Sequence, residues 1–158
     1  MNKKILLAGA LLSLVLFSGC ILQTAKKEPA ELSAETAVNL SGHGLKSIPM
    51  NIFDKTTLLN LDISNNQLTG ALPSQIQKLK NLKVLKANDN LMTGVPAEIG
   101  QLEKLEVLDL SNNNLTGLPN ELGNLKNLRV LNLAGNKYSE MDLKTIRQSL
   151  PQTNFILK

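Results

Sequence analysis

The strongest constraint on the fold of this chain is a leucine pattern that recurs four times between residues 58 and 138. Each copy reads L-x-x-L-x-L-x-x-N-x-L or a close variant of it. The copies are separated by steps of 24, 23 and 23 residues and open at Leu58, Leu82, Leu105 and Leu128. A fainter copy precedes them, with Val38, Leu40, His43 and Leu45. Independent apolar segments do not keep such a register, so the chain is expected to repeat one structural unit.

The L-x-L core of each copy has the two-residue period of a β-strand, so its leucines share one face of a short strand. A single coil of this kind has nothing to bury its leucines against, and it buries them only by stacking on the next coil. Aromatic residues make up only 3% of the chain, in agreement with an aliphatic core. The pattern therefore predicts a short solenoid with a parallel sheet.

The period and the motif resemble the leucine-rich repeat family, whose units span about 20–29 residues. The resemblance covers residues 35–138. It implies an α/β solenoid of about five coils, with a parallel sheet on the concave side and short helical or 3₁₀ segments on the convex side. In this family the asparagine of each copy is a rung of a ladder, because its amide offers donors and an acceptor to neighbouring coils. The expected rungs are Asn66, Asn90, Asn113 and Asn136.

Turn-forming residues follow the asparagine of each copy. The dipeptides Thr69-Gly70, Thr93-Gly94 and Thr116-Gly117 predict turns with unusual dihedral angles. A proline comes next, and apolar residues three apart then predict a short helical or 3₁₀ return segment. These apolar pairs are Ile76/Leu79, Ile99/Leu102 and Leu122/Leu125.

The charge balance argues against nucleic-acid binding, and the cysteine content argues against an internal disulfide. The formal net charge is +4, and without Lys3 and Lys4 the chain keeps 15 basic and 13 acidic residues, a net charge of +2. Nucleic-acid binding requires a clustered basic face, which this balance does not supply. The single cysteine excludes an intramolecular disulfide.

Residues 1–19 predict an export signal, with two lysines at its start and an apolar run over residues 5–17. The sequence Phe17-Ser18-Gly19-Cys20 resembles the bacterial lipobox, in which a cysteine is lipidated and becomes the mature N-terminus; that motif usually has leucine where Phe17 stands. The position of the only cysteine favours lipidation of Cys20. An uncleaved anchor or a plain secretory signal is the main alternative, since the apolar stretch reaches a marginal transmembrane length, and a free reactive thiol at Cys20 is a further one.

Residues 20–34 are predicted to be the lipidated cysteine and a linker, because residues 26–29 are charged, broken by proline and not repeated. Two lipid chains suffice for stable anchoring, so the linker is expected to hold the solenoid off the membrane. The residue after the cysteine is Ile21, which resembles the rule for outer-membrane forwarding in enteric-type bacteria. The expected location is the bacterial cell envelope, with a lipid anchor, and the outer membrane if the source is Gram-negative.

Both ends of the repeat region differ from its middle. In the first coil His43 replaces the ladder asparagine, and no second histidine or nearby acidic cluster supports a metal site there. Phe53 is expected to fill the interior of this coil. Residues 139–158 are expected to form a C-terminal cap with a helix that begins at Ser139 and a final strand at residues 154–157. The apolar stripe of that helix is Leu143, Ile146 and Leu150.

The resemblance also implies where binding occurs, since residues that flank the strand leucines point outward on the concave face. The expected partner-binding residues are Asn60, Asp62, Lys83, Val84, Lys86, Glu106, Val107, Asp109, Arg129 and Asn132. Ser64 and Ser111 are expected on the same face. One column of alternating sign, through Lys86, either stabilises the sheet by cross-strand pairs worth about 0.2–1 kcal/mol each or is a recognition pattern. A valine strip beside it is typical of a contact site, although valine also suits strands.

Catalysis is not expected from this sequence. One histidine and a cysteine assigned to lipid cannot form a Cys-His or metal constellation. A Ser-His-Asp triad would have to use His43, on a coil without a nucleophile elbow. Glu106 and Asp109 are expected on an open surface that does not desolvate them for acid–base chemistry. No cofactor, metal or small-molecule substrate is therefore expected.

Three functions remain open at this stage. The first is a lipid-anchored module that binds another protein through its concave face. The second is a structural envelope lipoprotein without a dedicated ligand, and the third is a cytosolic effector or regulator. Replacement of concave-face residues discriminates the first two, and the state of the N-terminus separates the third.

Overall fold

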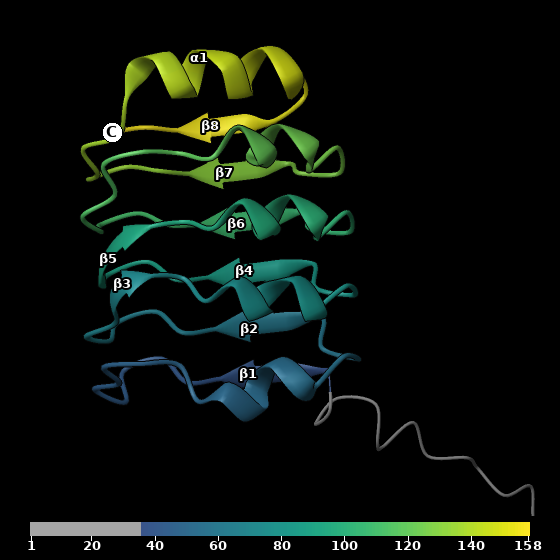
Figure 1. Cartoon of the computed structure of the whole chain (residues 1–158), viewed down its shortest axis with the longest axis vertical. Coiled ribbons are helices and arrows are strands. Elements are labelled where there is room, and N and C mark those ends of the chain that lie inside the picture. The colour runs from purple at the N-terminus through teal and green to yellow at the C-terminus, as the bar shows by residue number, and fades with distance from the viewer. Residues whose placement is uncertain (1–35) are drawn as a thin grey trace, which may run out of the picture.

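The computed structural model describes residues 36–158 as a single stack of coils (Figure 1). The predicted signal, Cys20 and linker at residues 1–34 lie outside the described residues. Six short strands lie side by side along the stack, one per coil, and they are β1 (Ala37–Asn39), β2 (Asn60–Asp62), β4 (Val84–Lys86), β6 (Val107–Asp109), β7 (Val130–Asn132) and β8 (Asn154–Ile156). They form one parallel sheet in the order β1-β2-β4-β6-β7-β8. The predicted fold class is confirmed.

The register of this sheet follows the leucine repeat. Leu61 pairs with Leu85, Leu85 with Leu108, and Leu108 with Leu131. The fainter first copy joins in the same way, with Val38 opposite Leu61. Residues at equivalent repeat positions therefore form straight columns across the strands, and every column keeps its side of the sheet.

Four 3₁₀ helices form the opposite side of the stack, and they are η1 (Met50–Asp54), η2 (Ser74–Lys78), η3 (Ala97–Gln101) and η4 (Asn120–Asn124). Each begins directly after a proline, at Pro49, Pro73, Pro96 and Pro119. The ring of proline fixes φ near the value that a helix start requires, and its missing N–H is not needed at that position. The prediction of short 3₁₀ return segments is confirmed.

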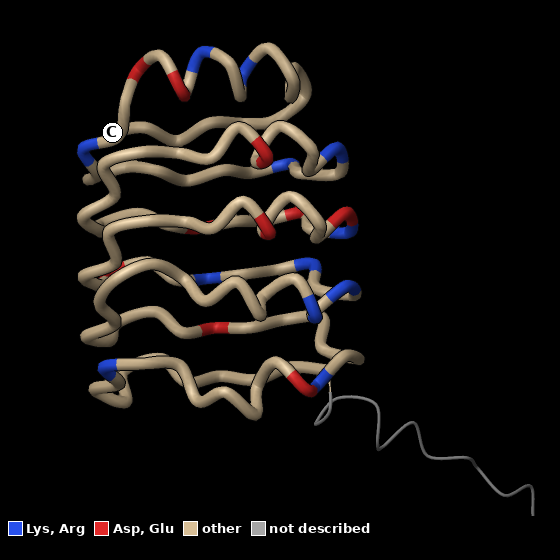
Figure 2. Tube along the Cα trace, viewed as in Figure 1, with Lys and Arg blue, Asp and Glu red and all other residues tan. Residues whose placement is uncertain are grey.

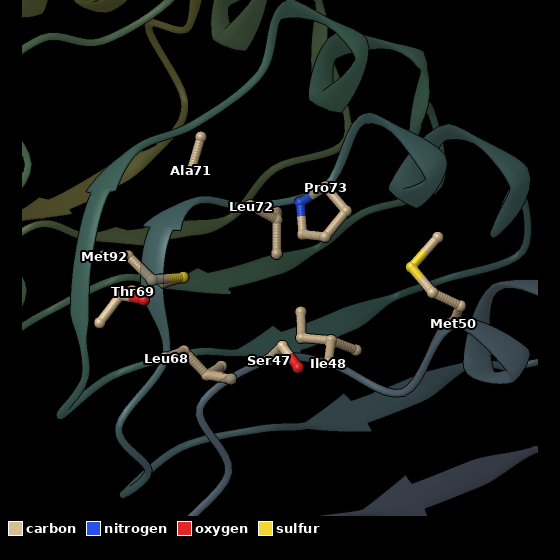
Figure 3. Close-up of a pocket in the computed structure, with 9 residues that line it drawn as sticks. All are labelled: Ser47, Ile48, Met50, Leu68, Thr69, Ala71, Leu72, Pro73 and Met92. Atoms are coloured by element: carbon tan, nitrogen blue, oxygen red, sulfur yellow. The ribbon is translucent and has the colours of Figure 1, made fainter.

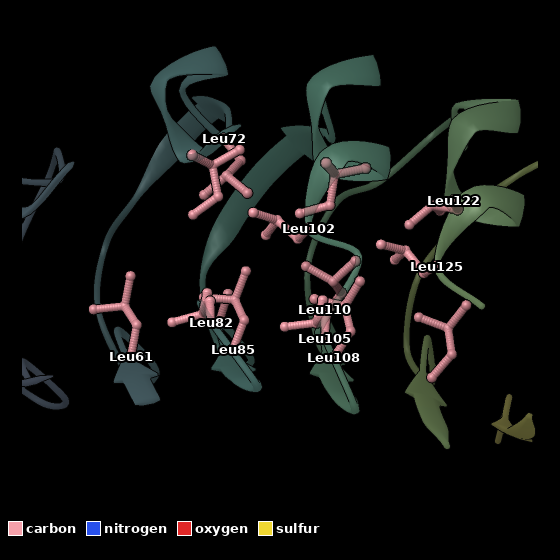
Figure 4. Close-up of a cluster of buried hydrophobic side chains, with 14 of the residues drawn as sticks. Leu61, Leu72, Leu82, Leu85, Leu102, Leu105, Leu108, Leu110, Leu122 and Leu125 are labelled. Atoms are coloured by element: carbon pink, nitrogen blue, oxygen red, sulfur yellow. The ribbon is translucent and has the colours of Figure 1, made fainter. Parts of the chain in front are cut away.

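The core lies between the sheet and the 3₁₀ helices. Figure 4 shows leucines of successive coils stacked in rows, with side chains from the strands below and from the 3₁₀ segments above. Leu85, Leu102 and Leu108 are fully buried, as are Ile76 and Leu122. Full burial of one such side chain is worth about 1.5–3 kcal/mol. Each coil buries its apolar side chains against the coils next to it, so the core runs without interruption along the stack.

A second, two-stranded parallel sheet lies on one flank, formed by β3 (Thr69–Ala71) and β5 (Leu91–Gly94). The prediction of turns was wrong for these residues. Of the three glycines in the Thr-Gly pairs only Gly70 has a positive φ, of +73°. The second coil also has one residue more between Leu68 and Pro73 than the other coils have between the equivalent positions. The register of β3 shifts between Gly70 and Ala71. The extra residue is therefore absorbed as a bulge on the flank.

A left-handed residue turns the chain away from the sheet after each of the first five strands of the stack. The residues with positive φ at this position are Gly42, Asn65, Asp89, Asn112 and Gly135. Asparagine and aspartate adopt this conformation more readily than other side chains, and glycine adopts it without steric cost. The turn sets the position of the asparagine that follows it.

The C-terminal end is closed by α1 (Glu140–Ser149) and by β8, which pairs with β7. Ser139 caps the helix by accepting a hydrogen bond from the backbone N–H of Asp142 at 3.4 Å. Leu143, Ile146 and Leu150 are all buried, as the apolar stripe predicted. The first coil has its expected filler in Phe53, which is fully buried, whereas Val38, Leu40 and Leu45 are only partly buried.

Candidate functional site

The ladder asparagines connect successive coils through their amides. Asn113 is buried, its Nδ2 donates to the carbonyl of Ala87 in the preceding coil at 3.0 Å, and its Oδ1 accepts from the backbone N–H of Met92 at 3.0 Å. The same Nδ2 also lies within hydrogen-bond distance of two carbonyls in its own turn. Asn66, Asn90 and Asn136 make the equivalent bonds. These four residues therefore satisfy backbone groups inside the stack and are not exposed for a ligand.

A second asparagine column, which sequence reasoning missed, lies ahead of the strands. Nδ2 of Asn81 donates to the carbonyl of Thr56 at 2.9 Å, and Nδ2 of Asn127 donates to the carbonyl of Glu103 at 2.8 Å. Between them the equivalent position holds Lys104, whose Nζ donates to Oδ1 of Asn81 at 2.7 Å. The only signal in the sequence was an Asn–Leu pair at the same repeat position in two coils.

The surface with binding potential is the outward side of the six-stranded sheet, called the sheet face below. Register places most of the predicted residues on it in two columns. One column is Asn60, Val84, Val107 and Val130, and the other is Asn39, Asp62, Lys86, Asp109 and Asn132. Lys83, Glu106 and Arg129 each precede a strand by one residue and form a third column. The three valines of the first column form the valine strip, which is half-buried between the polar second and third columns.

Carboxylates and amides of the second column hold the turns at the strand ends. Oδ1 of Asp62 accepts from both the backbone N–H and the hydroxyl of Ser64, at 3.0 and 2.6 Å, and Oδ1 of Asp109 accepts from Ser111 at the same distances. Asn39 and Asn132 accept from the backbone N–H two residues ahead in the same way. The expectation that Ser64 and Ser111 face outward was wrong, because these hydrogen bonds draw both serines into buried positions.

Lys86 is the exception in this column. It carries no acceptor for the turn that follows, and its side chain is 54% exposed, with Nζ 3.8 Å from Oδ2 of Asp62. Oδ2 of Asp109, on the other side of Lys86, accepts from Nδ2 of Asn132 at 3.1 Å. Lys86 is therefore the member of the column whose polar group is not used for the backbone of its own coil.

The third column is a row of ion pairs. The carboxylate of Glu106 lies between two cations, 3.3 Å from Nζ of Lys83 and 3.7 Å from Nε of Arg129. All three side chains are partly or largely exposed, so each pair is worth no more than a few tenths of a kcal/mol to about 1 kcal/mol in stability. Figure 2 shows acidic and basic positions alternating along the stack, negative on β2, positive on β4, negative on β6 and positive directly before β7.

Two shallow hollows are lined mainly by apolar atoms. One, of about 260 Å³, lies on the sheet face between the first and third coils and has Asn60, Val84 and Lys86 in its lining. The other, also about 260 Å³, lies on the flank beside β3 and has no charged lining residue. In Figure 3 its lining comes from the first coil (Ile48, Met50), from β3 and the turn after it, and from Met92 of the next coil. This second hollow therefore lies where the first coil meets the bulged second coil.

The described residues contain neither a cluster of metal-ligating side chains nor a membrane-spanning helix. Within residues 36–158, no group of three or more His, Cys, Asp and Glu side chains is arranged to hold a metal ion. His43 is exposed, and its Nδ1 donates to the carbonyl of Ser41 at 2.8 Å. None of the helices in the same residues has the length and apolarity that crossing a bilayer requires.

The stacked coils, the parallel sheet and the 3₁₀ returns define a solenoid repeat protein. Residues 37–156 match the family profile described as a leucine-rich repeat region, so the chain belongs to the leucine-rich repeat family. Folds of this family are typically protein-binding modules rather than enzymes. A comparison with curated proteins finds no match to the sequence.

Solved structures of similar fold come from bacteria and plants. A leucine-rich repeat protein of Leptospira interrogans is 40% identical, with a TM-score of 0.66 over 70% of this chain and 28% of that one. The ectodomain of the receptor kinase GASSHO1/SCHENGEN3 from Arabidopsis thaliana, solved in complex with CASPARIAN STRIP INTEGRITY FACTOR 2, is 32% identical, with a TM-score of 0.67 over 78% of this chain and 15% of that one. The BIR3–SERK2 complex from the same plant is 34% identical, with a TM-score of 0.54, over 64% and 54% of the chains. This chain thus spans only a minor part of the first two.

Proposed function

We propose that this chain is a membrane-anchored leucine-rich repeat lipoprotein that binds a protein partner through its sheet face. The fold supports a protein-binding role, and two of the similar plant structures are of complexes. The anchor is inferred from the lipobox-like sequence that ends at Cys20, and the bacterial cell envelope follows from it. No catalytic step is assigned to the chain.

The observation that carries the binding proposal is the position of Lys86. Its neighbours in the column, Asp62 and Asp109, each use one carboxylate oxygen to accept a hydrogen bond within the turn of their own coil, whereas Lys86 makes no such bond. It stands at the edge of the hollow on the sheet face, next to the half-buried Val84. An exposed cation beside an apolar depression offers a partner both a charged contact and an apolar one, the two components of a stable interface.

The test is a cross-linked pull-down of the full chain from its native envelope. Lys83→Glu combined with Lys86→Glu reverses both cations that the third coil places on the sheet face, and this variant is expected to lose a protein that the wild type captures. Lys46→Glu combined with Lys137→Glu is the matched control, since it changes the net charge equally at exposed positions outside the six strands. Equal capture by all three proteins would remove the sheet face from consideration and favour a structural envelope component without a dedicated ligand.

The anchor is tested separately. Metabolic labelling with a fatty-acid analogue is expected to label the wild type and not Cys20→Ala, and the labelled protein is expected in the membrane fraction. An unlabelled, full-length protein in the soluble fraction would reject the lipoprotein assignment and support the cytosolic alternative. Capture of a partner is scored in the same preparations, so the two parts of the proposal fail independently.

A further inference from the structure

The charges of the sheet face have an order that reads the same when it is reversed and inverted in sign. β2 carries one negative charge (Asp62), the third coil carries two positive charges, the fourth coil carries two negative charges, and Arg129 of the fifth coil is positive. The charges of the third and fourth coils are Lys83, Lys86, Glu106 and Asp109. The face as a whole is neutral, so it offers no general attraction for a polyanion or a polycation.

Register adds a geometric condition that this order satisfies. Lys86 is the register partner of Asp109, and Val84 is the register partner of Val107, so each pair lies at one level along the strands. Lys83 and Glu106 precede these valines by one residue and lie 3.3 Å apart at their charged ends. A two-fold rotation about an axis parallel to the strands, midway between β4 and β6, keeps that level and exchanges the two strands.

We propose that the sheet face binds the sheet face of a second copy of this chain, with the two-fold axis in this position. β4 then faces β6 of the second copy, which sets Lys83 opposite Glu106 of the second copy and Lys86 opposite Asp109 of the second copy. The valine strips meet at the centre, with Val84 opposite Val107 of the second copy. Every contact occurs twice, as an isologous interface requires. This inference rests on the proposed use of the sheet face for protein binding and names its occupant.

The side chains involved are free enough to form these contacts. Lys83 and Lys86 are 50% and 54% exposed, and each has one carboxylate beside it within its own chain, at 3.3 and 3.8 Å. A second carboxylate from the opposite copy adds to this pairing without breaking it. Contact removes water from the valine strip and from the charges, and removal of water strengthens the attraction between opposite charges. A foreign partner does not require the observed inversion of sign, whereas a second copy does.

The experiment uses two differently tagged full-length copies expressed together, with capture of one tag and measurement of the other. Variant A is Lys83→Glu with Lys86→Glu, which makes the third and fourth coils both negative. Variant B is Glu106→Lys with Asp109→Asn, which leaves both coils positive or neutral and keeps the oxygen that caps Ser111. Wild type is expected to capture wild type, and A with A or B with B is expected to fall at least about tenfold, since like charges then face each other.

The mixed pair is the decisive measurement. A with B places negative charges opposite positive charges in both halves of the interface, so capture is expected to return to near the wild-type level. Failure of A with B to recover, for variants whose far-UV circular dichroism matches the wild type, would overturn the proposal. If either variant is misfolded, wild-type capture that does not fall between about 0.05 M and 0.5 M salt would overturn it instead.

The same samples separate this inference from the binding proposal on which it rests. Proteins other than the second copy are identified in each capture. A foreign protein that variant A loses, without any capture of a second wild-type copy, would sustain the sheet face as a binding surface and reject the second copy as its occupant.

Discussion

Nζ of Lys104 donates a 2.7 Å hydrogen bond to Oδ1 of Asn81, at the repeat position where the next coil carries Asn127. Lys104 therefore interrupts a column in which each asparagine donates to a backbone carbonyl of the preceding coil. Lys104→Asn is expected to restore the bond, with the carbonyl of Lys80 as acceptor, and to stabilise the protein by about 0.5–1.5 kcal/mol. Chemical denaturation measures this change. Lys104→Ala is the control and is expected to give no gain, and a gain equal to that of the asparagine variant would reject the explanation.

The asparagine ladder predicts a large loss of stability when one rung is removed. Asn113→Ala removes a buried amide that bonds to the carbonyl of Ala87 and the N–H of Met92, so both backbone groups lose their partner. The free energy of unfolding is expected to fall by about 1–3 kcal/mol. Asn114→Ala is the matched control, because Asn114 is exposed and its side chain makes no hydrogen bond within residues 36–158. A loss of only a few tenths of a kcal/mol at position 113 would contradict the ladder.

Asp109 both accepts the hydrogen bonds that cap a turn and carries a negative charge, and two substitutions separate these contributions to stability. Asp109→Asn keeps an oxygen for the N–H of Ser111, loses only the part-buried bond from Nδ2 of Asn132 and is expected to cost much less stability than removal of the whole side-chain cap. Asp109→Ala leaves the buried Ser111 without its acceptor and is expected to cost about 1–3 kcal/mol. Thermal or chemical unfolding compares the two. Equal losses would mean that the carboxylate stabilises the fold by its charge and not by capping the turn.

The C-terminal helix approaches the last 3₁₀ helix at Gly123. A Cβ added there would lie 2.8 Å from Cβ of Ser149, closer than packed side chains allow. Gly123→Ala is therefore expected to push α1 away and to destabilise the protein by about 1–3 kcal/mol. Adding Ser149→Gly removes the clash, so the double variant is expected to recover part of the loss in a double-mutant cycle. Strict additivity of the two single losses would show that this contact is not responsible.

The hydroxyl of Tyr138 is expected to make the stability of the folded state depend on pH in the alkaline range. Partial burial of the ring and the nearby carboxylate of Glu140 raise the pKa of the Tyr138 hydroxyl above its usual value of 10.0, and Arg147 opposes this shift. Because the folded state then holds its proton more tightly than the unfolded chain, its stabilising contribution is complete below pH 10 and is lost as pH rises through the folded pKa. Tyr138→Phe is expected to flatten this decline in unfolding experiments at alkaline pH. An unchanged slope would assign the decline to other groups.

The elements set by the repeat could be predicted from the sequence, and those set by contacts between coils could not. Leu61, Leu85 and Leu108 had to align, because one burial pattern repeats at a nearly constant step. The second sheet was missed because Thr69-Gly70 is turn chemistry by composition, and strand pairing there depends on how the adjacent coil lies. Ser64 was placed outward by alternation, but the left-handed Asn65 that follows it shows that the strand pattern had already ended.

On the sheet face, too, some features could be predicted from the repeat and others depended on contacts between side chains. Its columns could be read from residue order, since the register follows from the leucines. The difference between Asp109, which caps a turn, and Lys86, which does not, required the side-chain contacts. The bonds of Asn81 and Asn127 to the preceding coil could not be foreseen, because nothing in a single coil shows which backbone carbonyl lacks a donor.

The bulge between Gly70 and Ala71 has a consequence for how this protein can change over generations. It adds a residue to one coil while Asn60 and Val84 on the opposite side stay in register. Mutations that lengthen or shorten the flank can therefore accumulate without altering the spacing of side chains on the sheet face. The two surfaces are free to evolve separately, and an inserted peptide tag or loop has a tolerant site between residues 70 and 71.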